Sequence, residues 1–238
     1  MERNRANDCR DARQRRPETG RAALCVATLA AIVVSVSLAL AANASVPIAT
    51  YVREFESRYA DVRTLQADFT QTDNSWGRVR EGSGAVYLAR GGRMRWVYEK
   101  PEKKLFISDG KKVFFYVPAE KQLTVSPAHP GEAQIPLDLL LSHLRLSKIF
   151  SRVEFADQAL EAAHGDRVIR GYPRFAYKRD IRSVLIELTP SFDVRRLVVF
   201  STDNSTMQFA FSHIELNKPL GAALFLFSPP PGTEVINE

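Results

Sequence analysis

The sequence is poor in the residues from which most catalytic and metal sites are built. Its 238 residues include only two cysteines, Cys9 and Cys25, and four histidines. Both cysteines precede residue 45, so the rest of the chain can form neither a disulfide framework nor a thiolate site. No two of the histidines, at positions 129, 143, 164 and 213, have metal-ligand spacing on one expected element. A zinc site or a thiol enzyme is therefore not expected.

Motifs for nucleophilic and nucleotide chemistry are also missing. The chain has no G-x-S-x-G motif, and Gly82-Ser83-Gly84 is not followed by the lysine and helix start that a phosphate loop requires. Each carboxylate can be explained as a solvated group or a turn former, as Asp109 is in an Asp-Gly turn. A secreted lipid hydrolase that uses a serine and one of the histidines is the enzymatic alternative that the sequence leaves open, and His213 is the histidine to test.

The first 44 residues have the pattern of a secretory signal. Arginines at positions 15, 16 and 21 precede an apolar run over residues 22–42, and Ala42-Asn43-Ala44 has the small-x-small form of a cleavage site. The run is also long enough to span a bilayer, so a retained anchor is the alternative. The cleavage motif favours removal after Ala44. We expect one domain over residues 45–238.

The charge of the expected mature chain is modest. Residues 45–238 hold 26 basic and 23 acidic residues, a balance of +3, although the precursor has a pI of about 9.4. Arg90, Arg93 and Arg95 alternate with apolar residues and could form a nucleic-acid strip, but a secreted protein does not meet that partner. A solvated strand face is the simpler interpretation, and no nucleic-acid partner is expected.

Residues 82–118 form the most informative stretch. Apolar runs at 85–89, 94–98, 105–108 and 113–117 are separated by Gly91-Gly92, by Glu99-Lys100-Pro101 and by the hairpin signal Asp109-Gly110. The run 94–98 alternates, with Met94, Trp96 and Tyr98 on one face. The run 113–117 is apolar on both faces, which an antiparallel strand with one wet face would not be. Something apolar is expected to cover its second face.

The remaining pattern predicts an antiparallel meander that curls into a sandwich or barrel. Helices are expected over residues 46–66 and from Pro136, where five leucines in eight residues leave little polar surface, and a further helix is considered over 147–162. The other expected strands are 67–71, 122–125, 184–189, 195–201, 207–216 and 224–228. All 14 phenylalanines follow residue 44. So much apolar surface without a catalytic constellation indicates a cavity for acyl chains.

Several motifs together resemble a known family. They are DFTQ at 68–71, RGGRMRW at 90–96, ISDGKKVFFYVP at 107–118, KQLT at 121–124, NKPL at 217–220 and FLFSPPPGTEVI at 225–236. Through them the chain resembles the periplasmic outer-membrane lipoprotein carriers, the LolA family. The resemblance covers nearly all of the expected mature chain.

The resemblance implies a mainly β fold, an incomplete antiparallel barrel (half-barrel) closed by a lid of short α-helices. It implies a non-enzymatic, monomeric periplasmic chaperone without a cofactor. Such a carrier takes triacylated lipoproteins from an inner-membrane ABC transporter to an outer-membrane receptor. A carrier or sensor of another lipid or glycolipid is the alternative. It stays open because the family usually has a proline after the arginine that matches Arg90, whereas this chain has Gly91-Gly92, and because residues 152–178 are unusual.

The resemblance also suggests site residues. Arg90 matches an arginine that holds the lid closed through backbone hydrogen bonds, and its expected partners lie near Tyr59, Leu140 and Leu141. Together with the apolar pattern it suggests that acyl chains contact Met94, Trp96, Phe114, Tyr116 and Leu137. For each apolar residue an ordinary core position is the alternative, because alternation does not fix which face of a strand is concave.

Overall fold

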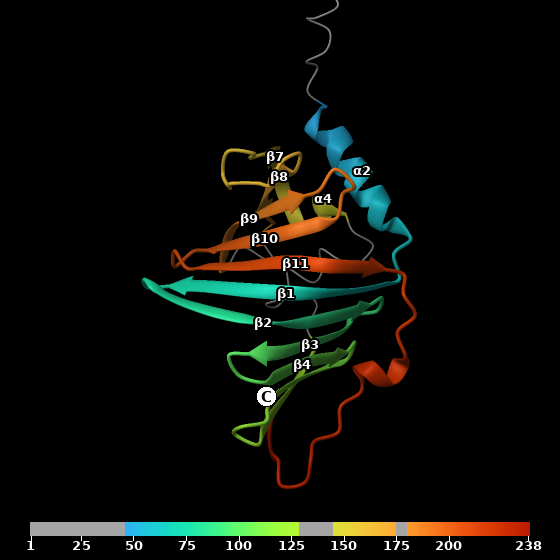
Figure 1. Cartoon of the computed structure of the whole chain (residues 1–238), viewed down its shortest axis with the longest axis vertical. Coiled ribbons are helices and arrows are strands. Elements are labelled where there is room, and N and C mark those ends of the chain that lie inside the picture. Colours follow the sequence, from blue (N-terminus) through green and yellow to red (C-terminus); the bar gives the residue numbers. More distant parts are fainter. Residues whose placement is uncertain (1–45, 129–144, 175–179) are drawn as a thin grey trace, which may run out of the picture. The chain divides into compact units, whose positions relative to one another are not determined.

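Strands pair side by side in one continuous sheet across most of the described chain (Figure 1). The computed structural model describes residues 46–128, 145–174 and 180–238. The chain divides into two units, residues 1–46 and 47–238, and the sheet belongs to the second. The expected signal peptide and Leu137, Leu140 and Leu141 lie outside the described residues.

The sheet has twelve strands among the described residues, in the order β12-β6-β5-β4-β3-β2-β1-β11-β10-β9-β8-β7. They are β1 (Thr64–Ser75), β2 (Arg78–Ala89), β3 (Arg93–Lys100), β4 (Lys104–Asp109), β5 (Lys112–Val117), β6 (Gln122–Pro127), β7 (Phe150–Phe155), β8 (Arg167–Pro173), β9 (Ile181–Leu188), β10 (Val194–Ser201), β11 (Thr206–Leu216) and β12 (Glu234–Asn237). All neighbours are antiparallel except β12 and β6. The end strands β7 and β12 do not pair with each other, so the sheet is open.

The turns follow the chemistry of their residues. Asp109 ends β4, and its carboxylate accepts hydrogen bonds from the backbone N–H groups of Lys111 and Lys112, both at 2.7 Å. These bonds hold the pKa of Asp109 below its ordinary value, and the nearby lysine charges act in the same direction. Gly110, at φ +93°, supplies the left-handed residue of the turn. The hairpin interpretation of Asp-Gly is confirmed.

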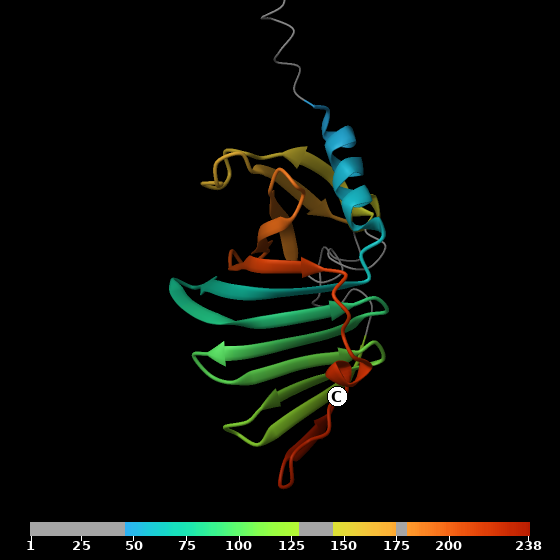
Figure 2. The same cartoon turned by 45° about the vertical axis from the view of Figure 1, so that its right-hand side comes forward.

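One face of the sheet carries the main core. Helix α2 (Ile48–Ala60) buries a stripe of Tyr51, Phe55 and Tyr59 in the same cluster as residues of both halves of the sheet. The Tyr51 ring lies 5.3 Å from that of Phe155 on β7. Figure 2 shows α2 running beside the strands of the C-terminal half. The expected helix over 46–66 is therefore present but ends six residues earlier, because β1 begins at Thr64.

The opposite face of β3–β5 is covered by the chain's own C-terminal segment. The 3-10 helix η3 (Ala222–Phe225) buries Phe225 to 1% exposure, and the Phe227 ring lies 5.2 Å from that of Tyr116 and 6.2 Å from that of Phe114. Arg95 donates from its guanidinium to the Leu224 carbonyl at 3.1 Å. This packing explains why residues 113–117 are apolar on both faces.

Three local expectations differ from the structure. The helix considered over 147–162 is limited to α4 (Leu146–Ile149), since from residue 150 the chain pairs as β7 with β8. The strand expected at 224–228 is wrong, because this segment binds the sheet through the Phe225 and Phe227 side chains and not through a backbone ladder. Strands β8 and β12 were not expected.

A smaller core covers the outer side of β8–β10. The loop over 156–166 lies on it and is held by Glu187, a side chain that is 1% exposed. Its carboxylate accepts from Ala163 N at 2.9 Å and from Arg196 Nε at 2.6 Å. The unusual segment after β7 is thus part of the fold. Among the described residues, no helix is both long and apolar enough to cross a membrane.

Candidate functional site

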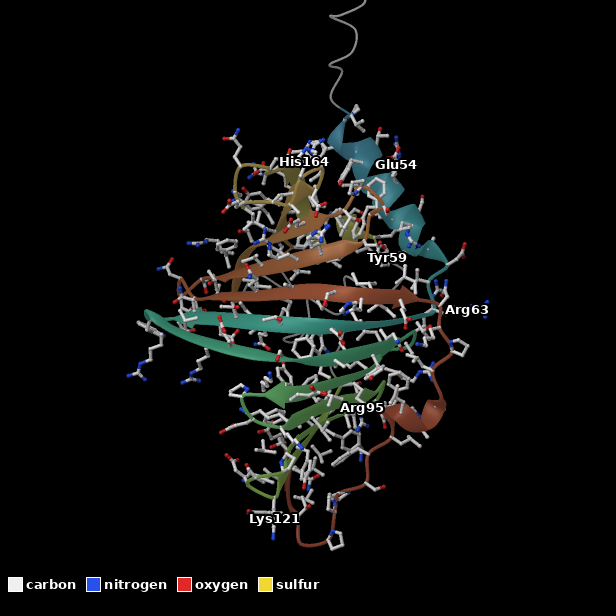
Figure 3. The ribbon with its side chains drawn as sticks, viewed as in Figure 1. Glu54, Tyr59, Arg63, Arg95, Lys121 and His164 are labelled. Carbon is white, nitrogen blue, oxygen red and sulfur yellow. The ribbon has the colours of Figure 1, made fainter. Side chains whose placement is uncertain are left out.

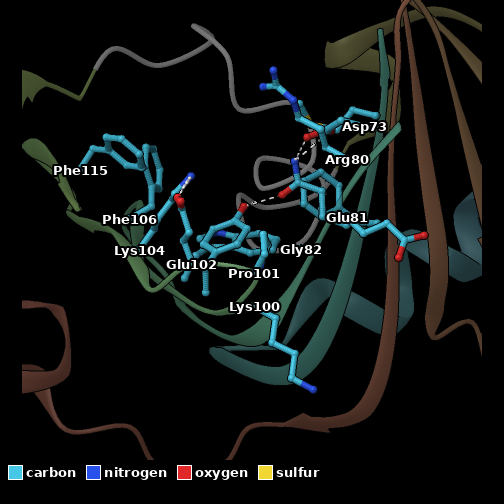
Figure 4. Close-up of a pocket in the computed structure, with 15 residues that line it drawn as sticks. Asp73, Arg80, Glu81, Gly82, Lys100, Pro101, Glu102, Lys104, Phe106 and Phe115 are labelled. Atoms are coloured by element: carbon cyan, nitrogen blue, oxygen red, sulfur yellow. Dashed lines mark hydrogen bonds and ion pairs between the residues drawn. The ribbon is translucent and has the colours of Figure 1, made fainter. Parts of the chain in front are cut away.

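A pocket of about 460 Å³ opens on the face of the sheet that carries the main core, in the N-terminal half of the sheet (Figure 4). We call it the aromatic pocket. Its apolar lining consists of Trp96, Tyr98, Phe106, Phe115, Met207 and Phe209. Its polar lining consists of Gln71, Asp73, Arg80, Glu81, Lys100, Glu102 and Lys104, with Gly82 and Pro101 between them. The apolar lining is therefore suited to hydrocarbon, and the polar lining can contact water or a polar group.

Strand register assembles the apolar wall. Trp96 on β3 lies opposite Phe106 on β4, and Phe106 lies opposite Phe115 on β5. Directly opposed residues of antiparallel strands point to the same face, so the three rings form a row across the sheet. Phe115 remains 39% exposed although it is large and apolar. The wall therefore has apolar surface that the protein's own core does not use.

Trp96 joins this wall to the core. It is 4% exposed, and its ring lies 4.7 Å from that of Phe69 and 5.2 Å from that of Phe209. Its indole N–H has no hydrogen-bond partner among the described residues. A buried donor without an acceptor is costly, so this N–H is a polar group that the described residues leave unsatisfied.

The polar side of the pocket is ordered by hydrogen bonds. The Tyr98 hydroxyl donates to Gln71 Oε1 at 2.6 Å, and Gln71 Nε2 donates to both carboxylate oxygens of Asp73 at 2.8 and 3.0 Å. Burial raises the pKa of Tyr98 to about 12, with a smaller contribution from the negative charge of Asp73. Tyr98 is therefore a neutral donor at ordinary pH. Figure 4 also shows the exposed pair of Lys104 and Glu102, 3.3 Å apart.

Arg90 lies at the C-terminal end of α2. Its Nε donates to the Val62 carbonyl at 2.8 Å, and its terminal nitrogen donates to the Ala60 carbonyl. The last carbonyls of a helix lack intrahelical partners and carry partial negative charge, so a guanidinium there is favourable. Gly91 and Gly92 follow at φ +84° and +72°. Proline, whose φ is fixed at about −65°, could not take the place of Gly91 in this turn.

Tyr59 lies one residue before this contact. Figure 3 labels Tyr59 and Arg63 where α2 ends and the chain turns toward β1. The Tyr59 hydroxyl accepts a hydrogen bond from the backbone N–H of Val194 on β10 at 3.3 Å. Burial raises the pKa of Tyr59 to about 12. The helix end is therefore held from two sides, by the turn between β2 and β3 and by β10.

The structure brings together only some of the expected site residues. Trp96 lines the aromatic pocket, and Met94, on the same face, is 3% exposed in the main core. Phe114 and Tyr116 point to the opposite face, where they pack on Phe227. Sequence reasoning missed Phe106 and Phe115. The Asp109-Gly110 turn could have identified them, because its register places Phe115 opposite Phe106 and Phe106 opposite Trp96.

Nothing in the described ranges resembles a metal site, since no three histidine, cysteine, aspartate or glutamate side chains gather there as ligands would. His213 is 83% exposed at its side chain and pairs with Asp68, 2.8 Å away.

Comparison with known proteins decides the family. The family model for "Outer membrane lipoprotein carrier protein LolA" matches residues 60–228. The chain belongs to the LolA family. LolA-family members bind and carry other molecules and are not enzymes, so the lipid hydrolase alternative is set aside.

Two curated relatives support this membership. An outer-membrane lipoprotein carrier protein of Nitrosospira multiformis is 32% identical over 196 residues, which is 80% of this chain and 90% of the relative. Another, of Dechloromonas aromatica, is 30% identical over 180 residues, 75% of this chain and 83% of the relative. Among solved structures, an uncharacterized conserved protein of Thermus thermophilus superposes with a TM-score of 0.51 at 13% identity. It covers 81% of this chain and 100% of its own, and it supports the fold alone.

Proposed function

We propose that this LolA-family chain is a periplasmic carrier that shelters lipoprotein acyl chains in the aromatic pocket. The observation that carries the proposal is the row of Trp96, Phe106 and Phe115, apolar rings that face an open pocket. The curated relatives are named outer-membrane lipoprotein carrier proteins, which supports the same role. A non-directional apolar wall suits hydrocarbon chains.

In this proposal the open sheet acts as a half-barrel and helices act as its lid. Helix α2 is one part of the lid, and the leucine-rich segment after Pro136, with Leu137, Leu140 and Leu141, is the other. Arg90 is the clasp, since its guanidinium binds the carbonyls at the end of α2. Release of this contact would let the helix move away from the sheet.

The energetics explain why such a carrier needs help to load. Burial in lipid contributes about 0.8 kcal/mol per CH₂, so three long acyl chains amount to about 30 kcal/mol. The free energy of non-covalent binding saturates at about 20 kcal/mol. We therefore propose that an inner-membrane ABC transporter drives loading. A receptor at the outer membrane, with a site of higher affinity, then takes the cargo from a monomeric carrier.

The size of the pocket leaves room for a second candidate. A volume of about 460 Å³ is that of an ordinary small-molecule site. Three acyl chains would require it to enlarge, whereas a lipid with a single chain would not. A carrier of a simpler lipid or glycolipid is therefore the alternative function. In either case the free indole N–H of Trp96 can donate to an ester or amide carbonyl at the head of a chain.

The cargo can be identified directly. We expect the protein, released gently from the cell envelope, to carry a triacylated lipoprotein that mass spectrometry detects. We also expect it to release lipoprotein from inner-membrane vesicles in the presence of ATP. Recovery of a free lipid or glycolipid instead would favour the alternative, and failure to bind any acylated molecule would contradict both.

Two neighbouring phenylalanines provide a matched pair of variants. Phe115→Ser removes an exposed ring from the aromatic pocket and should reduce the cargo recovered several-fold while the fold is retained. Phe114→Ser removes a ring from the opposite face, where it contacts Phe227, and should leave cargo binding unchanged. The reverse result would place the acyl chains on the face of Phe114 and Tyr116.

A further inference from the structure

The turn between β1 and β2 has an unusual residue at its first central position. Ser75 pairs with Arg78, so the loop has two residues, Trp76 and Gly77, at φ +56° and +75°. Two positive φ values are characteristic of a type I′ turn, in which Asn-Gly is preferred because asparagine tolerates the left-handed region. A tryptophan at the first position is unfavourable there.

No ring contact among the described residues compensates for this choice. The Trp76 side chain belongs to no aromatic or cation–π pair of the described residues, and the residue is 88% exposed. An exposed indole in a strained position therefore gains no ring contact from the described part of the chain. A residue that costs stability without a structural return indicates a role outside the folded chain.

The residues around Trp76 include exposed apolar and exposed basic side chains. Val79 on β2 is 60% exposed and Met207 on β11 is 38% exposed. Arg78 and Arg80 pair in the β1–β2 ladder through their backbones, but their exposed side chains have no hydrogen bond or ion pair with any described residue. We call residues 75–80 the β1–β2 tip. Figures 1 and 2 show it projecting beyond the turns of the neighbouring strands.

We propose that the β1–β2 tip docks on the headgroup layer of an anionic phospholipid bilayer. Tryptophan concentrates at membrane interfaces, where its apolar ring and its N–H are both satisfied. Unpaired arginines are attracted to anionic headgroups and can bind their phosphate oxygens by two hydrogen bonds at once. Asp73, which lies opposite Arg80 in the ladder, accepts hydrogen bonds from Gln71.

A bilayer suits the tip better than a protein partner does. A specific protein interface usually buries about 800 Å² on each side, over a continuous surface. The tip is a narrow projection with the apolar side chains of Trp76 and Val79 and flanking positive charges, so it offers too little area for such an interface. It can, however, penetrate a headgroup layer, which adapts its shape to the inserted group.

Docking here would bring the aromatic pocket to the membrane. A second, more polar pocket of about 580 Å³ lies at the tip, lined in part by Trp76, Arg78 and Ser205. It shares Asp73, Arg80 and Met207 with the aromatic pocket. An acyl chain could therefore pass between bilayer and pocket over a short path. The docking itself does not depend on the identity of the cargo.

The two tryptophans make the test direct. Trp96 is 4% exposed but lines the aromatic pocket, so the emission of Trp76→Asn, which keeps Trp96, is subtracted to isolate the change around Trp76. The protein, with its N-terminus defined by mass spectrometry, is titrated with phosphatidylglycerol-rich vesicles and with pure phosphatidylcholine vesicles. We expect a blue shift of the fluorescence with the anionic vesicles, weaker at high salt. Bromine-labelled lipid tails should quench the shifted emission.

Trp76→Asn is the decisive variant, because it creates the preferred Asn-Gly turn. It should retain or raise the melting temperature, abolish the blue shift and remove most vesicle co-sedimentation. Arg78→Gln and Arg80→Gln should each lower affinity for anionic vesicles about fivefold, the effect of one basic residue near a charged membrane.

The proposal is overturned if the emission of the wild-type protein is the same with and without anionic vesicles. It is equally overturned if Trp76→Asn sediments with vesicles as the wild type does. A loss of lipoprotein transfer in Trp76→Asn without any vesicle binding by the wild type would assign the tip to a protein partner instead. A carrier with a different cargo would change none of these outcomes, so the docking and the proposed function fail separately.

Discussion

At the scale of single residues, Arg90 acts through hydrogen bonds to backbone carbonyl groups. Its side chain binds two carbonyls at the end of α2, and its own N–H donates to the Arg63 carbonyl at 3.0 Å. These contacts connect the turn between β2 and β3 to the helix end. The sequence identified Arg90 by resemblance and placed its partner near Tyr59, and the observed acceptors follow that residue by one and three positions.

Replacing Arg90 should loosen α2 without unfolding the sheet. Arg90→Leu removes two hydrogen bonds from a charged donor, which we expect to lower the free energy of unfolding by about 1–2 kcal/mol. Backbone amides of residues 48–60 should exchange hydrogen faster, as measured by mass spectrometry, while those of β1 and β11 keep their protection. Arg63→Leu is the control, since its side chain makes no hydrogen bond or ion pair with the described residues. If the amides of residues 48–60 exchange equally fast in the wild type and in Arg90→Leu, the proposal that Arg90 holds the end of α2 is contradicted.

At the scale of elements, the close approach of β2 to β3 depends on Gly84. A Cβ atom at this position would lie 1.8 Å from the Val97 carbonyl oxygen and 3.1 Å from the Tyr98 Cα. The ladder shifts register between Ser83 and Gly84, so the strands approach each other at an irregularity. Phe69 lies opposite Gly84 on β1, and its ring contacts those of Trp96 and Tyr98. The absence of a side chain at Gly84 therefore helps to position the aromatic wall.

We expect Gly84→Ala to be strongly destabilising, because backbone and not a flexible side chain blocks the methyl group. Overpacking of this kind costs about 1–3 kcal/mol and occasionally more. Urea unfolding should show a lower midpoint with an unchanged slope. Gly221→Ala should stay within about 0.5 kcal/mol of wild type, since Gly221 has φ −65° and no atom near the added Cβ. A small effect at Gly84 would mean that the two strands can separate without loss.

The elements also explain what the sequence could and could not predict. Hairpins with strong turn residues, such as β4–β5 around Asp109-Gly110, follow from local chemistry and were predicted almost to the residue. Strand β12 could not be predicted in the same way, because it exists only through pairing with β6, more than a hundred residues earlier. The segment at 224–228 has the apolar content of a strand, yet its side chains pack on the sheet and its backbone does not join it.

Which face of each strand lines the pocket was harder to predict from the sequence. Alternation states that Phe114 and Phe115 point in opposite directions, but not which of them faces the pocket. That depends on which face the C-terminal segment covers, a contact between Phe227 and Tyr116 across more than a hundred residues. Of the residues expected to contact acyl chains, Trp96 lines the pocket, whereas Phe114 and Tyr116 lie on the opposite face. That acyl chains contact any of them stays a prediction.

At the scale of the whole sheet, an open architecture has two edges to protect. Strand β7 contacts α2 and α4, whereas β6 is covered by β12. The cover is held by backbone hydrogen bonds, including Glu234 N to the Lys121 carbonyl at 2.8 Å and Glu238 N to the Val125 carbonyl at 3.0 Å. All four residues of β12 are exposed. Strand β12 therefore contributes mainly its backbone hydrogen bonds, which occupy the N–H and C=O groups of β6 that another chain could bind.

Removal of this cover should promote self-association. A chain truncated after residue 232 leaves the outer backbone groups of β6 unpaired, and an unpaired edge strand recruits a second copy. We expect light scattering to show a mass that rises with protein concentration, whereas the intact chain shows no comparable rise. Adding Gln122→Lys to the truncated chain should suppress the association, because a lysine on an edge strand opposes pairing. If the truncated chain has the same mass as the intact chain at every concentration, the last strand serves another purpose than protecting the edge.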